Sequence, residues 1–280
     1  CRPDSEPKRQ GDDVIAEGDS SHVDDWDPQA VKSVITRLRP ILKTWFRSEV
    51  RGLDVMPPGG ALVVSNHSGG LYAVDVPVFA VDFYDKFGYD RPVFTLSNDI
   101  MFRGPAAGPL TRVGFIPASR ANAATALRSG GIVVVFPGGD FDAYRPTSSA
   151  NKIHFAGRKG YVRTAIETGV PIVPMVSIGA QENQIFLTRG DWIAKRLGIR
   201  KMLGTNVLPI TFGVPFGINV VLPLNLPLPT KIVTEVLEPI DIAETFGAEP
   251  DVDEVDSHVR GVMQTALDRL ARERRFPVLG

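Results

Sequence analysis

Short β-branched segments alternate with helical segments along most of the chain, and few folds accommodate such an alternation. The expected strands are Ala61–Ser65, Val93–Leu96, Gly114–Pro117, Ile132–Phe136 and Ile172–Ile178, with helical patterns near Val74–Phe87, Ala121–Ser129 and Gly157–Thr168. Further strands are expected at Val207–Phe212 and Lys231–Leu237, before a closing helix over Val252–Arg275. Strands and helices at this spacing predict an α/β fold in which a mixed sheet is flanked by helices.

The N-terminal part divides into two segments. Residues 1–29 contain nine acidic and three basic residues and little apolar pattern, which predicts a disordered acidic leader. Residues 30–51 form a basic amphipathic helical pattern that is interrupted near Pro40 and contains six basic residues and one acidic residue. Two roles stay open for this helix, namely packing on the domain through its apolar side and docking on an anionic membrane surface. A single folded domain is expected over residues 52–280.

The charge balance and the cysteine content exclude several classes of protein. With 31 Lys and Arg against 32 Asp and Glu, the chain lacks the basic excess that would hold it on nucleic acid. The single cysteine, Cys1, excludes internal disulfides, a Cys-based zinc site and a Cys-His catalytic pair, so a reducing compartment is expected. The sequence contains no Gly-x-Ser-x-Gly, no phosphate-binding loop, no Gly-x-Gly-x-x-Gly and no histidine pair at metal-ligand spacing. We therefore expect no metal and no bound cofactor.

Two segments in the second half of the chain bear on membrane contact. Residues 207–229 carry no charge, but five prolines interrupt them, which argues against a spanning helix. Buried strands and turns are the expected structure, with a lipid-facing loop as the alternative. Residues 189–201 mix Trp192, Ile193 and Leu197 with five basic residues and one acidic residue. This segment either faces a membrane surface or packs on the sheet as an amphipathic helix.

One histidine directly follows an expected buried strand. His67 belongs to the segment Ala61-Leu-Val-Val-Ser-Asn-His-Ser-Gly-Gly. Ligands gather at the C-terminal ends of strands in open α/β sheets. A lone histidine is more often structural than catalytic, but a position after a strand, beside two glycines and ahead of an acid, favours catalysis.

Four sequence blocks resemble those of the glycerolipid acyltransferase superfamily, which includes 1-acylglycerol-3-phosphate acyltransferases. The blocks are Asn66-His67-Ser68-Gly69-Gly70 with Asp75, Gly114–Arg120, Val135–Asp140 and Val170–Pro174. They occur in the family's order, and the resemblance covers residues 52–239. It implies the acyltransferase fold, His67 and Asp75 as catalytic residues, and Arg120 as a residue that holds the phosphate of an acceptor.

The chain departs from the family pattern in two places. Seven residues separate His67 from Asp75 instead of four, and eight steps of regular helix would hold them ~12 Å apart. A contact between them requires Gly69 and Gly70 to loop out the extra residues. Gly138 stands where the third block has a glutamate, and this Gly-Gly sequence is similar to the monoacylglycerol and diacylglycerol acyltransferase-like branch. The second departure puts a phosphate-bearing acceptor in doubt.

These residues fit acyl transfer from a thioester. A neutral imidazole at His67 would take the proton from an acceptor hydroxyl as it attacks the acyl carbonyl. Asp75 would orient the ring, with Asp140 as the alternative acid. Backbone N–H groups around Gly138 and Gly139 are candidate oxyanion donors, and a simple tight turn is the other interpretation of these glycines.

Two cations are candidates for binding phosphate. Arg120 and Arg145 would contact the phosphate of the acceptor or the pyrophosphate of coenzyme A, since guanidinium groups suit such oxygens. A solvated surface position is the alternative for each of them.

The expected function is transfer of a fatty acyl group from acyl-coenzyme A, a co-substrate, to a hydroxyl of a glycerolipid acceptor, with a lysophospholipid first. The alternatives are transfer to a neutral mono- or diacylglycerol, a thioesterase or lysophospholipase, and a lipid-binding protein without activity. We expect a cytoplasmic protein that is peripherally attached to the membrane, with residues 30–51 as the anchor.

Overall fold

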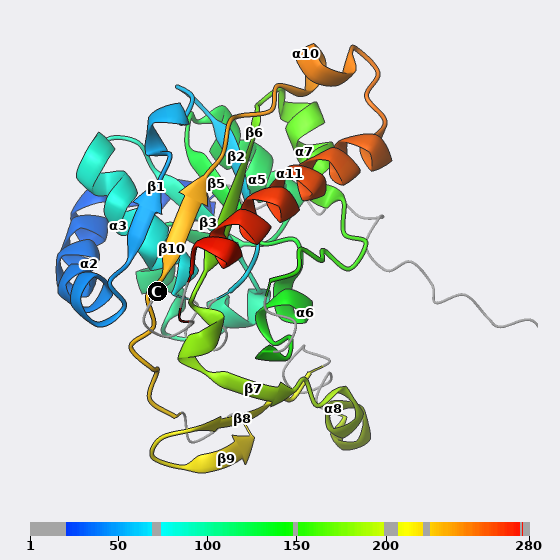
Figure 1. The fold of residues 1–280 in the computed structure, drawn as a ribbon. Coiled ribbons are helices and arrows are strands. Elements are labelled where there is room, and N and C mark those ends of the chain that lie inside the picture. Colours follow the sequence, from blue (N-terminus) through cyan, green and yellow to red (C-terminus); the bar gives the residue numbers. More distant parts are fainter. Residues whose placement is uncertain are drawn as a thin grey trace, which may run out of the picture.

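A seven-stranded mixed sheet forms the centre of the computed structural model, which describes residues 21–68, 74–147, 151–198, 207–220, 225–274 and 276 (Figure 1). Its strands are β1 (Glu49–Arg51), β2 (Ala61–Ser65), β3 (Val93–Ser97), β4 (Phe115–Pro117), β5 (Ile132–Val135), β6 (Ile172–Ile178) and β10 (Val233–Val236). The order is β1-β10-β6-β2-β5-β3-β4. Strands β6, β2, β5, β3 and β4 are parallel, and β10 runs antiparallel to β6. The predicted mixed sheet is confirmed.

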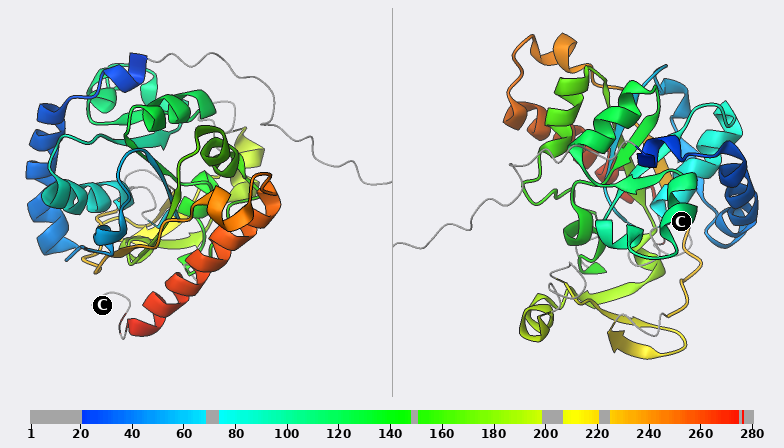
Figure 2. Two further views of the ribbon diagram at one scale, coloured as in Figure 1. Left: turned by 90° about the horizontal axis from the view of Figure 1, so that it is seen from above. Right: turned by 180° about the vertical axis from the view of Figure 1, so that it is seen from behind.

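Helices cover both faces of this sheet (Figures 1 and 2). One face packs against α5 (Arg120–Arg128), α7 (Gly160–Thr168) and α11 (Val252–Glu273), and the other against α2 (Pro28–Pro40) and α3 (Asp75–Phe87). Along β2, Leu62 and Val64 belong to the first core, and Ala61 and Val63 belong to the second. Both faces are buried, which explains why the strand is apolar throughout instead of alternating with polar residues.

The N-terminal helix packs on the domain. Its segment comprises α2, a π-helical turn over Ile41–Trp45 and then the strand β1, so helix ends at Trp45 and not at residue 51. The interruption follows Pro40, as predicted. The apolar residues Val31, Ile35, Leu42 and Phe46 are buried against α3 and the sheet. Packing of the helix is therefore confirmed, and its apolar stripe is already covered by protein.

The folded part begins before residue 30. The short helix α1 (Ser21–Asp24) places Val23 in the core, and the side chain of Asp27 caps the first turn of α2. The prediction of a disordered leader up to residue 29 was therefore wrong for residues 21–29, where buried Val23 and a capped helix start supply order. Residues 1–20 lie outside the described residues.

A second sheet projects from the end of the central sheet at which β6 finishes (Figure 1). It is antiparallel in the order β7 (Ile185–Thr188), β8 (Ile210–Gly213) and β9 (Gly217–Val220), with α8 (Asp191–Leu197) beside it. The remaining helices are α4 (Ala107–Arg112), α6 (Gly139–Ala143) and α10 (Ile242–Phe246), with short 3-10 turns at Leu53–Val55, Asp99–Phe102 and Gln181–Asn183. Among the helices that the structure describes, none has both the length and the apolar character needed to cross a bilayer.

Candidate active site

His67 lies immediately beyond β2, at the edge where the parallel strands end. Its Nδ1 lies 2.8 Å from Oδ2 of Asp75, the first residue of α3. The expected contact across seven intervening residues is therefore present. Asp75 is almost fully buried, and the His67 side chain is 17% exposed. Because a carboxylate only accepts hydrogen bonds, the Nδ1 of a neutral His67 carries the proton and Nε2 is left as the basic nitrogen.

Polar groups around Asp75 fix its carboxylate. The Ser68 amide donates to Oδ2 at 2.9 Å, and the Ser68 hydroxyl donates to Oδ1 at 2.6 Å. Hydrogen bonds to a carboxylate and a position at the start of a helix both stabilise its negative charge. The carboxylate is thus held toward the His67 ring by two further donors.

Asn66 ties the end of β2 to the end of β6. Its side-chain amide donates to the Ser177 carbonyl at 2.8 Å, and its side-chain oxygen accepts from the Ser177 amide at 2.8 Å. The Ser68 and Ser177 hydroxyl oxygens are also 3.2 Å apart. These buried contacts fix the backbone on either side of His67, which limits the orientations that the imidazole can adopt.

The third block adds a second buried acid. Asp142, in α6, accepts a 2.5 Å hydrogen bond from the His67 backbone amide. A Cβ atom at Gly138 would lie 2.3 Å from Cβ of Asp142, so no side chain fits at Gly138 beside this acid. Gly139 has φ +51°, and a Cβ atom there would lie 2.5 Å from Nη1 of Arg158. Position 138, where the family's third block has a glutamate, therefore has no room for a side chain beside Asp142, and Asp142 is the acid of this block that contacts the histidine segment.

Asp142 forms a buried ion pair with Arg145. Arg145 Nη1 lies 2.5 Å from Asp142 Oδ1, and Arg145 also donates to the Lys152 carbonyl and to the Gln181 side chain. Burial raises the pKa of Asp142, while Arg145 and the His67 amide act in the opposite direction. These two donors offset part of the cost of burying a carboxylate at this position.

Comparisons with known proteins agree with this geometry. The sequence model of a family described as Acyltransferase matches residues 47–178, which include His67, Asp75 and Asp142. The "Uncharacterized protein Rv0502" of Mycobacterium tuberculosis is 33% identical over 257 residues, covering 89% of this chain and 69% of that protein. The chain belongs to the glycerolipid acyltransferase superfamily.

Two further similarities place this acyltransferase among related proteins. The "DGAT1/2-independent enzyme synthesizing storage lipids" of Mus musculus is 26% identical, with 89% of this chain and 73% of that protein covered. The crystal structure of the 1-acyl-sn-glycerophosphate acyltransferase PlsC from Thermotoga maritima superposes with a TM-score of 0.52 at 21% identity, covering 89% of this chain and 83% of that one. This likeness confirms the predicted fold.

The other site residues predicted for this acyltransferase lie in different surroundings. Arg120 starts α5 and forms an ion pair with Glu167 at 2.7 Å, with both side chains about half exposed. Arg145 is buried in the ion pair with Asp142, so a solvated surface position is excluded. Asp140 lies in α6, and its side chain is outside the described part of the structure.

Sequence reasoning missed Asp142 and Ser177. Both contact the histidine segment from far along the chain, at separations of 75 residues for Asp142–His67 and 111 residues for Ser177–Asn66. One signal was available for Ser177, because it is a polar residue in the otherwise apolar strand β6. For Asp142, the signal is an acid three residues after the two glycines.

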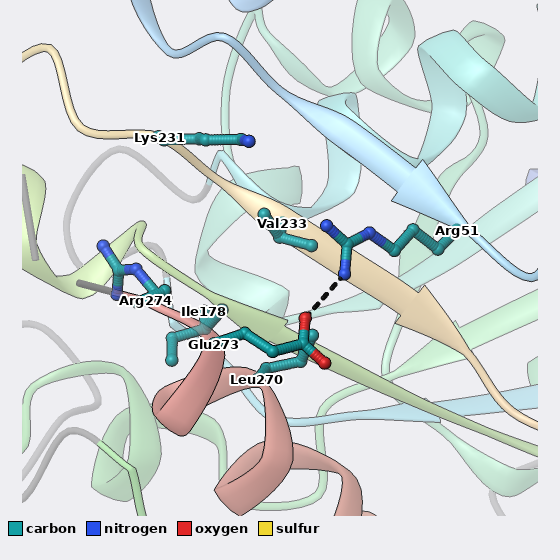
Figure 3. A pocket seen from close by; sticks show the side chains of 7 residues that line it. All are labelled: Arg51, Ile178, Lys231, Val233, Leu270, Glu273 and Arg274. Atoms are coloured by element: carbon teal, nitrogen blue, oxygen red, sulfur yellow. Dashed lines mark hydrogen bonds and ion pairs between the residues drawn. The ribbon is translucent and has the colours of Figure 1, made fainter. Parts of the chain in front are cut away.

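A small basic pocket lies elsewhere, between the β1-β10 edge and the end of α11 (Figure 3). Arg51, Lys231 and Arg274 line it together with Glu273. Each cation has a carboxylate partner: Arg51 pairs with Glu49 and Glu273, Lys231 with Glu49, and Arg274 with Glu182. None of the residues around His67 lines this pocket, and each of its cations is already paired with a carboxylate.

In the part of the chain that is described, no group of three or more His, Cys, Asp or Glu residues is placed to hold a metal.

Proposed function

We propose that this acyltransferase moves a fatty acyl group from a thioester, such as acyl-coenzyme A, to a hydroxyl of a glycerolipid, with His67 as general base. The observation that carries the proposal is the 2.8 Å contact between His67 Nδ1 and Asp75 Oδ2 at the C-terminal edge of the sheet. It leaves Nε2 of a partly exposed ring available to an incoming hydroxyl.

The reaction requires one proton to be moved twice. Nε2 of His67 takes the proton from the acceptor hydroxyl as its oxygen bonds to the thioester carbonyl carbon. The resulting imidazolium is stabilised by Asp75. When the carbon–sulfur bond breaks, the thiolate leaves with the bonding electrons and takes the proton back from His67. No enzyme nucleophile is needed, because a thioester is already activated and a thiolate leaves readily.

The oxyanion of the tetrahedral intermediate requires hydrogen-bond donors. The Gly139 amide donates to the Phe136 carbonyl at 3.0 Å and so belongs to the turn. The Gly138 amide is the candidate that remains of the two glycines. Donors fixed in this way stabilise the transition state without reorganising during the reaction.

Two observations favour a neutral mono- or diacylglycerol acceptor over the lysophospholipid expected first. Arg120 and Arg145, the candidate phosphate ligands, are each paired with a carboxylate. The chain is also similar to relatives named as a storage-lipid-synthesizing enzyme and as "Diacylglycerol O-acyltransferase 2-like protein 6". Because a carboxylate already neutralises each of these two arginines, an uncharged glycerolipid hydroxyl suits the site better than a phosphate-bearing acceptor.

The test is an acyl-transfer assay with labelled acyl-coenzyme A and a labelled acyl-carrier-protein thioester as donors. The acceptors are monoacylglycerol, diacylglycerol and a panel of lysophospholipids, with one sample lacking an acceptor. We expect transfer to a neutral acceptor, and we expect Arg120→Gln to leave its KM unchanged. Preferred transfer to a lysophospholipid, with a raised KM in Arg120→Gln, would restore the phosphate-binding role of Arg120.

Two results would overturn acyl transfer itself. If thiol is released equally fast without a lipid alcohol, then water is the acceptor and the protein is a thioesterase. If the folded protein binds lipid but transfers no acyl group to any acceptor, then it is a lipid-binding protein that retains the fold.

A further inference from the structure

The three-stranded sheet turns its apolar side outward. Phe212 of β8 pairs with Ile218 of β9, and Ile210 pairs with Val220, so these four side chains share one face. Phe212 is 48% exposed and Ile218 is 67% exposed. On the opposite face, Thr211 is buried and donates to Asn219 at 2.7 Å. Phe186 of β7, the neighbour of Thr211 in the sheet, is also buried on this inner face, so the sheet has apolar side chains on both faces and the outer ones are exposed to solvent.

Further exposed apolar side chains lie at the same end of the molecule. Val214 and Phe216 form the tip of the β8–β9 hairpin, and Leu226 lies beside it through a hydrogen bond from its amide to the Val214 carbonyl. Trp192 and Leu197 are exposed on α8, at the same end of the molecule (Figures 1 and 2). We call the following set the outer apolar surface: Leu187, Trp192, Leu197, Phe212, Val214, Phe216, Ile218, Val220 and Leu226. A gathering of exposed large apolar side chains at one end of a molecule marks a candidate site of interaction.

The small sheet is attached directly beside the catalytic residues. Its first strand follows β6, which ends at the same edge as β2. The Phe186 amide donates to the Thr147 hydroxyl at 3.0 Å, and Arg189 lies over the Phe141 ring at 3.8 Å. Gln181, which precedes β7, is hydrogen-bonded to Arg145 in both directions. A partner bound to the small sheet would therefore lie at the His67 edge.

The charges around the outer apolar surface identify the kind of partner. Within residues 185–230, the charged residues that the structure describes are three basic ones, Arg189, Lys195 and Arg196, and one acidic one, Asp191. Lys195 and Arg196 are exposed on α8, between Trp192 and Leu197. Exposed apolar side chains that include a tryptophan, together with a basic excess, match an anionic membrane surface. Two copies of this face would instead bring like charges together.

We infer that the outer apolar surface docks on an anionic phospholipid bilayer and holds the His67 edge of the sheet against it. This inference rests on the proposed function, because a long-chain glycerolipid acceptor resides in the membrane. The main membrane contact is then the small sheet and not residues 30–51, which the sequence had suggested as the anchor. The apolar stripe of residues 30–51 is buried, and Ile41 and Trp45 are their only exposed large apolar residues. Trp45 donates to the Pro227 carbonyl at 3.1 Å, next to Leu226, so it lies at the border of the same surface.

The test is vesicle co-sedimentation of the full chain without acyl donor, using phosphatidylcholine vesicles with and without phosphatidylglycerol. Phe216→Ser/Ile218→Ser removes two exposed side chains from the surface, and Ile166→Ser on α7 is the matched control. Arg37→Glu on α2 tests the N-terminal helix. We expect the double variant to bind anionic vesicles at least about tenfold more weakly than the wild type does. Ile166→Ser and Arg37→Glu should bind them like the wild type. Lys195→Glu/Arg196→Glu should remove most of the dependence on phosphatidylglycerol.

Three results would overturn the docking proposal: equal binding by wild type and the double variant, loss of binding only in Arg37→Glu, and a wild-type dimer that Phe216→Ser/Ile218→Ser converts to a monomer without lipid. These results do not depend on the proposed function, because vesicle binding is measured without acyl donor and therefore without acyl transfer. A short-chain, water-soluble monoacylglycerol completes the separation. The double variant should use this acceptor at the wild-type rate while losing transfer to the same lipid class in vesicles.

Discussion

The two sheets of this protein use apolar residues in opposite ways. The seven-stranded sheet buries apolar side chains on both faces beneath helices, and Asn66 and Ser177 are hydrogen-bonded where β2 and β6 end. The three-stranded sheet buries Thr211 and exposes Phe212 and Ile218. Burial of apolar side chains in the first sheet stabilises the folded protein. The exposed apolar side chains of the second sheet contribute no such stabilisation until a partner covers them. The first sheet therefore supports the reaction, and the second is suited to bring the reaction to a lipid surface.

Truncation of one phenylalanine in each region tests this contrast most strongly. Phe79 on α3 is fully buried in the core, whereas Phe216 is exposed at the hairpin tip. Phe79→Ala should lower the free energy of unfolding by about 3–5 kcal/mol, because it removes apolar burial and leaves a cavity. Phe216→Ala should change it by less than about 0.5 kcal/mol. Urea unfolding measures both, and a similar loss in the two variants would show that the small sheet is part of the core.

The ion pair that joins the two regions gives the next effect. Asp142→Asn removes the charge opposite the buried guanidinium of Arg145, which is also bonded to Gln181 before β7. We expect the free energy of unfolding to fall by about 3 kcal/mol, since an uncompensated buried charge remains. Asp191→Asn is the control, because Asp191 at the start of α8 is exposed and its 3.2 Å pair with Arg189 should contribute less than about 1 kcal/mol. Equal small losses would mean that Asp142 is neutral in the folded protein.

Removing the orienting acid should separate catalysis from docking. Asp75→Asn is expected to reduce kcat about 10²-fold, because the amide no longer stabilises the imidazolium or fixes its Nδ1 proton. Vesicle binding should not change, since Asp75 lies in the central region. Asp140→Asn serves as the comparison in the same assay. Wild-type activity in Asp75→Asn together with an inactive Asp140→Asn would show that the orienting acid comes from the third block.

The central sheet was predictable because its strands are short β-branched runs bounded by turns. β2 and β6 match the predicted ranges, and β5 differs by one residue at its end. The small sheet was only partly predictable. A strand was expected at Val207–Phe212, within a stretch of buried strands and turns over residues 207–229, and β8 (Ile210–Gly213) and β9 (Gly217–Val220) lie in that stretch. Their burial was predicted wrongly, because Phe212 and Ile218 are exposed, and β7 was not anticipated. An outward apolar face violates the pattern on which such predictions rest, because the residues that normally indicate a core are exposed there.

The site shows the same division between local and distant information. The pair His67 and Asp75 was predictable, because both belong to one sequence block and glycines lie between them. The location of Arg145 was not, because its burial depends on Asp142, Lys152 and Gln181 meeting in three dimensions. The spacing of residues cannot indicate whether a cation will meet a ligand or an internal carboxylate.

The most direct test of the account is acyl transfer by His67→Ala to a glycerolipid in anionic vesicles, measured with the unfolding midpoint and vesicle binding of the same protein. Loss of the imidazole should lower kcat by about 10²–10⁴-fold while leaving the fold and the binding unchanged, because the ring lies at a polar strand end and not in the core. His67→Gln should behave in the same way, since an amide cannot act as the base. Transfer at the wild-type rate by either folded variant would contradict the assignment of His67 as the general base.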